Sequence, residues 1–138
     1  MTQFEHANIT VPNIDAAIAF LLNAAPDFRV KIDQTPVGSY RWAHVGNDEC
    51  YFALQEPKDA TSSQDTRKPY HNIGVNHIGM IVDNLDHLQE KLLALGYEQN
   101  GLVTQEKHGR RTYFYDKAGF EWELVEYDSE KPEERYSY

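Results

Sequence analysis

Residues 4–15 have the sequence Phe4-Glu5-His6-Ala7-Asn8-Ile9-Thr10-Val11-Pro12-Asn13-Ile14-Asp15, and residues 75–86 have the sequence Val75-Asn76-His77-Ile78-Gly79-Met80-Ile81-Val82-Asp83-Asn84-Leu85-Asp86. The two stretches align without a gap, so that His6 meets His77 and Asn13 meets Asn84. The offset is 71 residues, about half of the 138-residue chain. A repeat of this length predicts two copies of one folding unit and not a solenoid of many short units.

Each copy is expected to begin with a strand and a helix. Apolar residues that alternate with polar ones predict strands over residues 6–11 and 76–82. A helix follows each strand, over about residues 15–24 in the first copy and up to about Leu95 in the second. A short side-chain oxygen can cap such a helix by accepting from its first free amides. The available caps are Asn13 or Asp15 for the first helix, and Asn84 or Asp86 for the second.

Three further strands follow the helix in each copy. They are predicted over residues 28–32, 40–45 and 51–55, and over residues 98–104, 111–115 and 120–127. The fold class is therefore α+β, with two βαβββ modules in a single domain of residues 1–138. The predicted boundaries are module one at about 4–56, a linker at 57–74, module two at 75–127 and an acidic tail at 128–138.

The last strand shows the clearest alternation of the chain. Trp122 and Leu124 alternate with Glu121 and Glu123. Successive strand side chains point to opposite faces of a sheet, so the apolar set is expected to lie against the helix and both glutamates to lie opposite. We interpret Glu121 as either a solvent-exposed side chain or a candidate general base.

The two repeated histidines are expected to share this polar sheet face. His6 and His77 each occupy the position before an apolar residue that must face the helix. Two histidines from different halves, together with a carboxylate, would make a metal site. The fourth strands of the two copies also align, and Ala53 then falls on Glu123. The first copy lacks this carboxylate, and Gln55, two residues further on, offers only an amide.

The composition excludes several classes of function. The net charge of −9 disfavours binding to nucleic acid or to an anionic membrane. No segment approaches the roughly 20 apolar residues of a membrane span, and the first residues do not resemble a signal peptide. One cysteine excludes an internal disulfide framework. We therefore expect a cytoplasmic protein whose partner is a small-molecule ligand or substrate.

The pattern resembles the vicinal oxygen chelate superfamily, which includes glyoxalase I, bleomycin-resistance proteins and extradiol dioxygenases. The resemblance covers residues 4–127. It rests on His6, on His77 in Val75-Asn76-His77-Ile78-Gly79, and on Asp116-Lys117-Ala118-Gly119-Phe120-Glu121-Trp122-Glu123-Leu124. It implies two modules paired into a cupped sheet around a divalent metal ion (Zn, Ni, Mn or Fe), and a homodimer.

By position, the resemblance implies His6, His77 and Glu123 as metal ligands. Glu121, from its place on the polar sheet face, and Glu123 are the expected catalytic carboxylates. The fourth ligand position of the family is Ala53 here, which disfavours glyoxalase I itself. Arg110 and Arg111 are expected either to steer an anionic substrate or to lie in a solvated turn.

Three functions stay open. The first is a metal-dependent lyase, isomerase or dioxygenase that acts on a small oxygenated metabolite. The second is a metal-free small-molecule-binding protein that resembles the bleomycin-resistance branch. The third is a domain that serves only dimerisation.

Overall fold

The computed structural model describes residues 1–58 and 68–135. The chain divides into two compact units, which we call unit 1 (Met1–Asn76) and unit 2 (His77–Tyr138) and describe separately. Half of the predicted linker, residues 59–67, and the end of the predicted tail, residues 136–138, lie outside the described residues. The prediction of a single domain stays a prediction.

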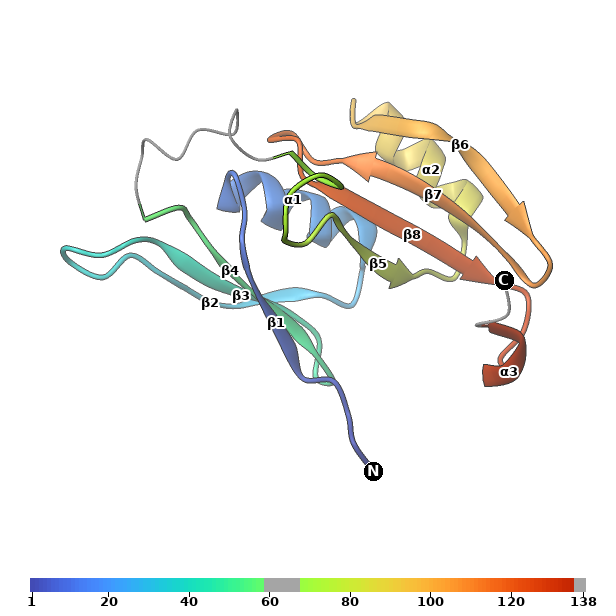
Figure 1. The fold of residues 1–138 in the computed structure, drawn as a ribbon, viewed down its shortest axis with the longest axis horizontal. Coiled ribbons are helices and arrows are strands. Elements are labelled where there is room, and N and C mark those ends of the chain that lie inside the picture. The colour runs from blue at the N-terminus through green and yellow to red at the C-terminus, as the bar shows by residue number, and fades with distance from the viewer. Residues whose placement is uncertain (59–67, 136–138) are drawn as a thin grey trace. The chain divides into compact units, whose positions relative to one another are not determined.

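Unit 1 has the order strand, helix and three strands (Figure 1). Its strands form one mixed sheet of order β1-β4-β3-β2, in which β1 and β4 are parallel and the other neighbours are antiparallel. The elements are β1 (His6–Thr10), α1 (Ile14–Ala24), β2 (Arg29–Gln34), β3 (Trp42–Gly46) and β4 (Tyr51–Gln55).

Unit 2 repeats this topology, with the sheet order β5-β8-β7-β6 and a parallel β5–β8 pair. The α+β class and both βαβββ modules are therefore confirmed. A short helix within the predicted tail was not expected from the sequence. The elements are β5 (His77–Ile81), α2 (Leu85–Ala94), β6 (Glu98–Glu106), β7 (Gly109–Tyr115), β8 (Glu121–Tyr127) and α3 (Pro132–Arg135).

The helices begin where the repeated asparagines cap them. Asn13 accepts a hydrogen bond from the amide of Ala16 at 2.8 Å, and Asn84 accepts one from the amide of His87 at 3.0 Å. The asparagines, and not Asp15 or Asp86, are thus the capping residues. In each unit, the cap fixes the point after the first strand at which the chain turns into its helix.

Each unit buries one face of its sheet against its helix. In unit 1, Phe20 of α1 and Leu54 of β4 are fully buried. In unit 2, Leu92 of α2, Trp122 and Leu124 are fully buried. Burial of a large apolar side chain contributes roughly 1.5–3 kcal/mol, so these sets fix which face of each sheet turns to the helix. The residues that alternate with them carry the candidate sites.

The described part of the chain contains no helix that is long and apolar enough to cross a membrane.

Candidate functional site

The strand registers place the repeated residues in equivalent positions of the two sheets. In unit 2, His77 lies opposite Glu121, and Gly79 lies opposite Glu123. In unit 1, His6 lies opposite Tyr51, and Asn8 lies opposite Ala53. The alignment of Ala53 with Glu123 is therefore confirmed, and both residues lie on the sheet face that points away from the helix.

His77 lies between two carboxylates. Its Nε2 is 3.0 Å from Oε2 of Glu123, and its Nδ1 is 3.5 Å from Oε1 of Glu121. Both glutamates are buried, with 5% and 6% of their surfaces exposed. The sequence expectation that Glu121 could be a solvated side chain is therefore wrong, because the neighbouring strands cover it.

Glu123 is held in place on its other oxygen. Oε1 of Glu123 accepts hydrogen bonds from Nη1 of Arg111 at 2.6 Å and from the hydroxyl of Tyr113 at 3.1 Å. Burial, followed by the charge of Glu123, raises the pKa of Tyr113, so its hydroxyl keeps its proton and donates. Arg111 also pairs with Glu106, whose two oxygens lie 2.6 and 2.7 Å from Nε and Nη2.

The carboxyl of Glu121 has partners of its own. It accepts a hydrogen bond from Nδ2 of Asn100 at 2.9 Å. Tyr115 also lies close, and burial followed by the charge of Glu121 raises the pKa of its hydroxyl. Glu121 therefore has a fixed orientation toward Nδ1 of His77, which suits a residue that positions the imidazole ring.

The contacts of His77 call for a cation. A neutral imidazole carries a single N–H, so it can donate to only one of the two carboxylates. Its other nitrogen then turns a lone pair toward a carboxylate oxygen, unless a second proton or a metal ion lies between them. The formal charges agree, since the one guanidinium of Arg111 pairs with both Glu106 and Glu123, and Glu121 is a further carboxylate that faces His77.

The donor set of unit 2 fits two positions of a divalent metal ion. Nε2 of His77 and Oε2 of Glu123 are 3.0 Å apart. An imidazole nitrogen and a carboxylate oxygen this close together could both bind one divalent ion. Within residues 1–58 and 68–135, however, no group of three His, Cys, Asp or Glu side chains is assembled that could hold an ion.

Glycine at position 79 makes room for the Glu123 carboxylate. A Cβ atom at Gly79 would lie 3.2 Å from Oε2 of Glu123. In unit 1 the sizes are exchanged, because the large side chain is Asn8 and the small one is Ala53. The polar group at this position of the sheet therefore comes from β8 in unit 2 and from β1 in unit 1.

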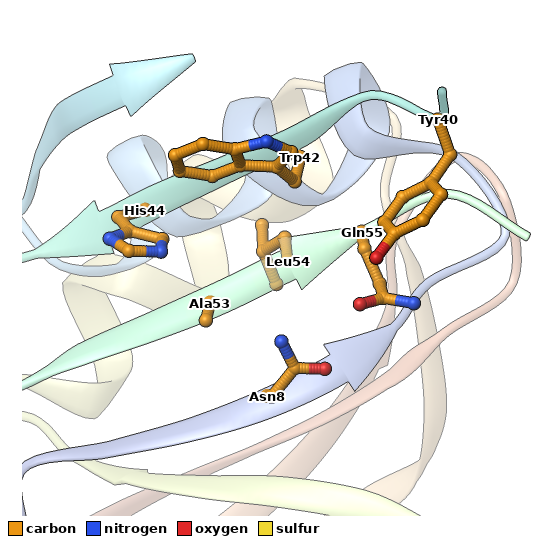
Figure 2. Close-up of a pocket in the computed structure, with 7 residues that line it drawn as sticks. All are labelled: Asn8, Tyr40, Trp42, His44, Ala53, Leu54 and Gln55. Carbon is orange, nitrogen blue, oxygen red and sulfur yellow. The ribbon is translucent and has the colours of Figure 1, made fainter. Parts of the chain in front are cut away.

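Unit 1 contains a hollow at the position that Ala53 leaves open. Figure 2 shows aromatic side chains along one side of it, the amide of Asn8 on the other, and the methyl group of Ala53 between them. Its volume is about 290 Å³. The residues that line it are Asn8, Tyr40, Trp42, His44, Ala53, Leu54 and Gln55.

The hollow adjoins a row of rings along the sheet. The ring centroids of Trp42 and His44 are 5.0 Å apart, those of His44 and Tyr51 are 4.7 Å apart, and those of Tyr51 and His6 are 4.9 Å apart. Burial, followed by the positive charges of His6 and Lys31, lowers the pKa of His44. The predicted ligand His6 thus stacks on Tyr51, and its Nδ1 is 2.7 Å from Oε2 of Glu5.

The two arginines of the basic hairpin lie on opposite faces of β7. Arg110 pairs with Asp86 at 2.8 Å and with Glu126 at 2.6 Å, while Arg111 pairs with Glu106 and Glu123. Both guanidinium groups are thus bound within unit 2, and neither lies in a solvated turn. The contact of Arg111 with Glu123 could not be inferred from the sequence, because it depends on the β7–β8 register.

The comparisons with known proteins identify the class of fold. A glyoxalase family protein from Bacillus cereus aligns with a TM-score of 0.75 at 17% identity, covering 94% of this chain and 96% of that chain. A genomically encoded fosfomycin resistance protein from Listeria monocytogenes aligns with a TM-score of 0.68 at 20% identity, covering 98% of both chains. An antibiotic-binding protein from a Streptomyces species aligns with a TM-score of 0.64 at 17% identity, covering 92% of this chain and 97% of that chain.

These likenesses define a glyoxalase-like fold. A comparison with curated protein sequences found no match. The sequence profile of the Glyoxalase/Bleomycin resistance protein/Dioxygenase superfamily matches residues 5–132. The chain therefore belongs to this superfamily, as the resemblance predicted.

Proposed function

We propose that the protein binds a divalent metal ion through His77 and Glu123 and acts as a metal-dependent lyase, isomerase or dioxygenase on a small oxygenated molecule. The observation that carries the proposal is the position of His77, whose two ring nitrogens both face carboxylate oxygens, at 3.0 and 3.5 Å. A neutral imidazole has one nitrogen without a proton, and a divalent ion would bind the lone pair of that nitrogen. The superfamily resemblance, which implies a divalent metal ion, also supports the proposal.

The residues around the proposed centre have separate tasks. Glu121 orients the ring of His77 through Nδ1, which leaves Nε2 as the donor nitrogen; such outer partners fix the tautomer of a ligating histidine. Arg111 and Tyr113 hold Oε1 of Glu123, which leaves Oε2 directed at His77. A divalent ion at this position supplies Lewis acidity toward a substrate oxygen.

His6 stays a predicted third ligand, on the strength of the sequence repeat. Glu121 and Glu123 stay predicted catalytic carboxylates. Of the two, Glu121 is the better candidate base, because its carboxylate is bound by neutral donors and not by a guanidinium. Formation of a homodimer also stays a prediction, which light scattering on the purified protein would test.

Metal titration of chelator-treated protein tests the proposal. We expect Co(II) to bind with one equivalent per chain and to give the visible absorption of a mixed nitrogen and oxygen site. His77→Ala should weaken binding by more than about 100-fold, beyond the loss caused by removing an outer partner. His87→Ala is the matched control, because His87 is an exposed histidine of α2.

A second pair of variants shows whether Glu123 is a specific metal ligand or whether the ion binds only through the negative charge of the surface. Glu123→Gln should abolish tight Co(II) binding, whereas Glu90→Gln, on the exposed side of α2, should leave it unchanged. Protein that takes up no Co(II), Zn(II), Ni(II), Mn(II) or Fe(II) would exclude the metal centre. Equal losses in Glu123→Gln and Glu90→Gln would mean that the ion binds only through general surface charge.

The second candidate function is metal-free binding of a small molecule. The observation that favours it is the hollow of unit 1, where Ala53 replaces a potential carboxylate and rings surround the space. The solved structure of the antibiotic-binding Streptomyces protein provides a precedent with the same fold. Binding that is equally tight with and without a chelator would support this function over the first.

A further inference from the structure

The hollow of unit 1 collects polar side chains that make no hydrogen bond to the part of the chain that the structure describes. Five side chains around it make no hydrogen bond to residues 1–58 or 68–135 (Figure 2). A ligand pocket typically combines rings with a few converging polar groups that fix the orientation of the ligand. Donors and acceptors left open around a concave surface therefore mark this face as a binding site. The five are Asn8, Tyr40, Trp42, His44 and Gln55.

Two lysine ammonium groups lie near the hollow and the row of rings that adjoins it, although the chain as a whole is acidic. None of the side chains that form the hollow is a carboxylate. The Nζ atom of Lys58 lies 5.0 Å from the ring centroid of Tyr40, and that of Lys31 lies 5.6 Å from the ring centroid of Tyr51. The acidic group described near this row, Glu5, is paired with His6 at 2.7 Å.

The size and shape of the hollow limit the ligand. Its volume of about 290 Å³ lies at the lower end of the range for ligand pockets, roughly 300–1,000 Å³. The space suits one or two fused rings and a short polar substituent. Trp42 offers an aromatic face for stacking, and the amides of Asn8 and Gln55 offer N–H donors.

We infer that this hollow binds a planar aromatic anion, such as an aromatic carboxylate, which stacks on Trp42 and directs its negative group toward the Tyr40 end, where Lys58 lies. The inference rests on the second candidate function and names its ligand class. Every residue that carries it belongs to unit 1.

A series of matched probes tests the sign of the ligand charge. Isothermal titration calorimetry in the presence of EDTA would compare 2-naphthoate, its neutral analogue 2-naphthamide and the cationic 2-naphthylmethylammonium. We expect 2-naphthoate to bind with the lowest Kd and the cation with the highest. Equal or tighter binding of the amide or the cation would overturn the inference, as would the absence of 2-naphthoate binding below about 1 mM, which corresponds to roughly −4 kcal/mol.

Three variants locate the site. Ala53→Leu fills the floor of the hollow and should abolish 2-naphthoate binding. Lys58→Gln should raise its Kd by roughly two- to fivefold, as expected for an exposed ion pair. Lys107→Gln, at an exposed position of unit 2, is the control and should have no effect. A thermal melt of each variant, followed by circular dichroism, shows whether a loss of binding comes from a blocked site or from unfolding.

A fourth variant, which removes a ring, keeps the inference testable if Ala53→Leu does not fold. Trp42→Leu removes the stacking surface of a half-buried side chain and should weaken 2-naphthoate binding by at least tenfold, since stacking on an aromatic ring contributes roughly 1–3 kcal/mol. Wild-type affinity in Trp42→Leu would contradict the proposed pose. Metal titration of His77→Ala and Glu123→Gln reports separately on the metal centre, so failure of one proposal is distinguishable from failure of the other.

Discussion

Replacing Gly79 with alanine probes how closely the Glu123 carboxylate must be positioned. The new Cβ would lie 3.2 Å from Oε2 of Glu123, which is a few tenths of an ångström inside ordinary contact. The carboxylate cannot simply move away, because its other oxygen is bound by Arg111 at 2.6 Å and by Tyr113 at 3.1 Å. Relief therefore requires Oε2 to turn away from Nε2 of His77.

The expected effect is large on the metal site and small on the fold. Metal–ligand distances tolerate about ±0.2 Å, so a shift of this size should weaken Co(II) binding by roughly tenfold. Gly79 has no positive φ. At such a position, replacing glycine with alanine stabilises the fold by about 0.4–1 kcal/mol, because it reduces the conformational entropy of the unfolded chain. The free energy of unfolding should therefore stay within about 1 kcal/mol of wild type.

Two measurements on the same variant check this reasoning. Calorimetric titration of chelator-treated Gly79→Ala gives the Kd for Co(II), and urea unfolding gives its stability. Asn8→Ala is the matched control, since Asn8 occupies the equivalent position of unit 1 beside Ala53. Unchanged Co(II) affinity in Gly79→Ala, or a loss that only accompanies unfolding, would refute the proposed position of the ion.

Three further outcomes are expected. Glu121→Gln should weaken Co(II) binding by about tenfold in the same titration, because it loosens the orientation of the histidine ring; unchanged affinity would remove Glu121 from the site. Ala53→Glu should lower the free energy of urea unfolding by about 1–3 kcal/mol through overpacking against Asn8, and adding Asn8→Gly should restore part of it. The hydrogen bond from Arg41 lowers the pKa of Asp33. That pair therefore stabilises the fold above the unfolded pKa of about 4 and loses this contribution as the pH falls toward the folded value. Between pH 6 and pH 2, the free energy of unfolding should fall less steeply in Arg41→Gln than in wild type. Parallel curves for the two proteins would contradict the pairing.

The repeat in the sequence carried enough information to predict the fold. The two aligned asparagines became the two helix caps, because capping depends only on residues within one turn. The alternation of Trp122 with Glu123 predicted the sheet face of each, since strand geometry has a period of two. The end residues of strands were less predictable, and β7 begins at Gly109, two residues before the expected start.

The candidate site was only partly predictable, because its contacts cross between strands. His77 and Glu123 were expected together on one sheet face, and their side chains do meet in unit 2. The guanidinium of Arg111 reaches Glu123 only through the β7–β8 register, which local patterns do not encode. The hollow beside Ala53 likewise depends on Asn8 and His44 being its neighbours on the two adjacent strands.

Anomalous diffraction from crystals grown with Co(II) would test the central claim most directly. A peak about 2.0–2.2 Å from both Nε2 of His77 and Oε2 of Glu123 is the predicted result. No peak at that position, with the 3.0 Å contact between the two side chains intact, would contradict the proposed metal centre.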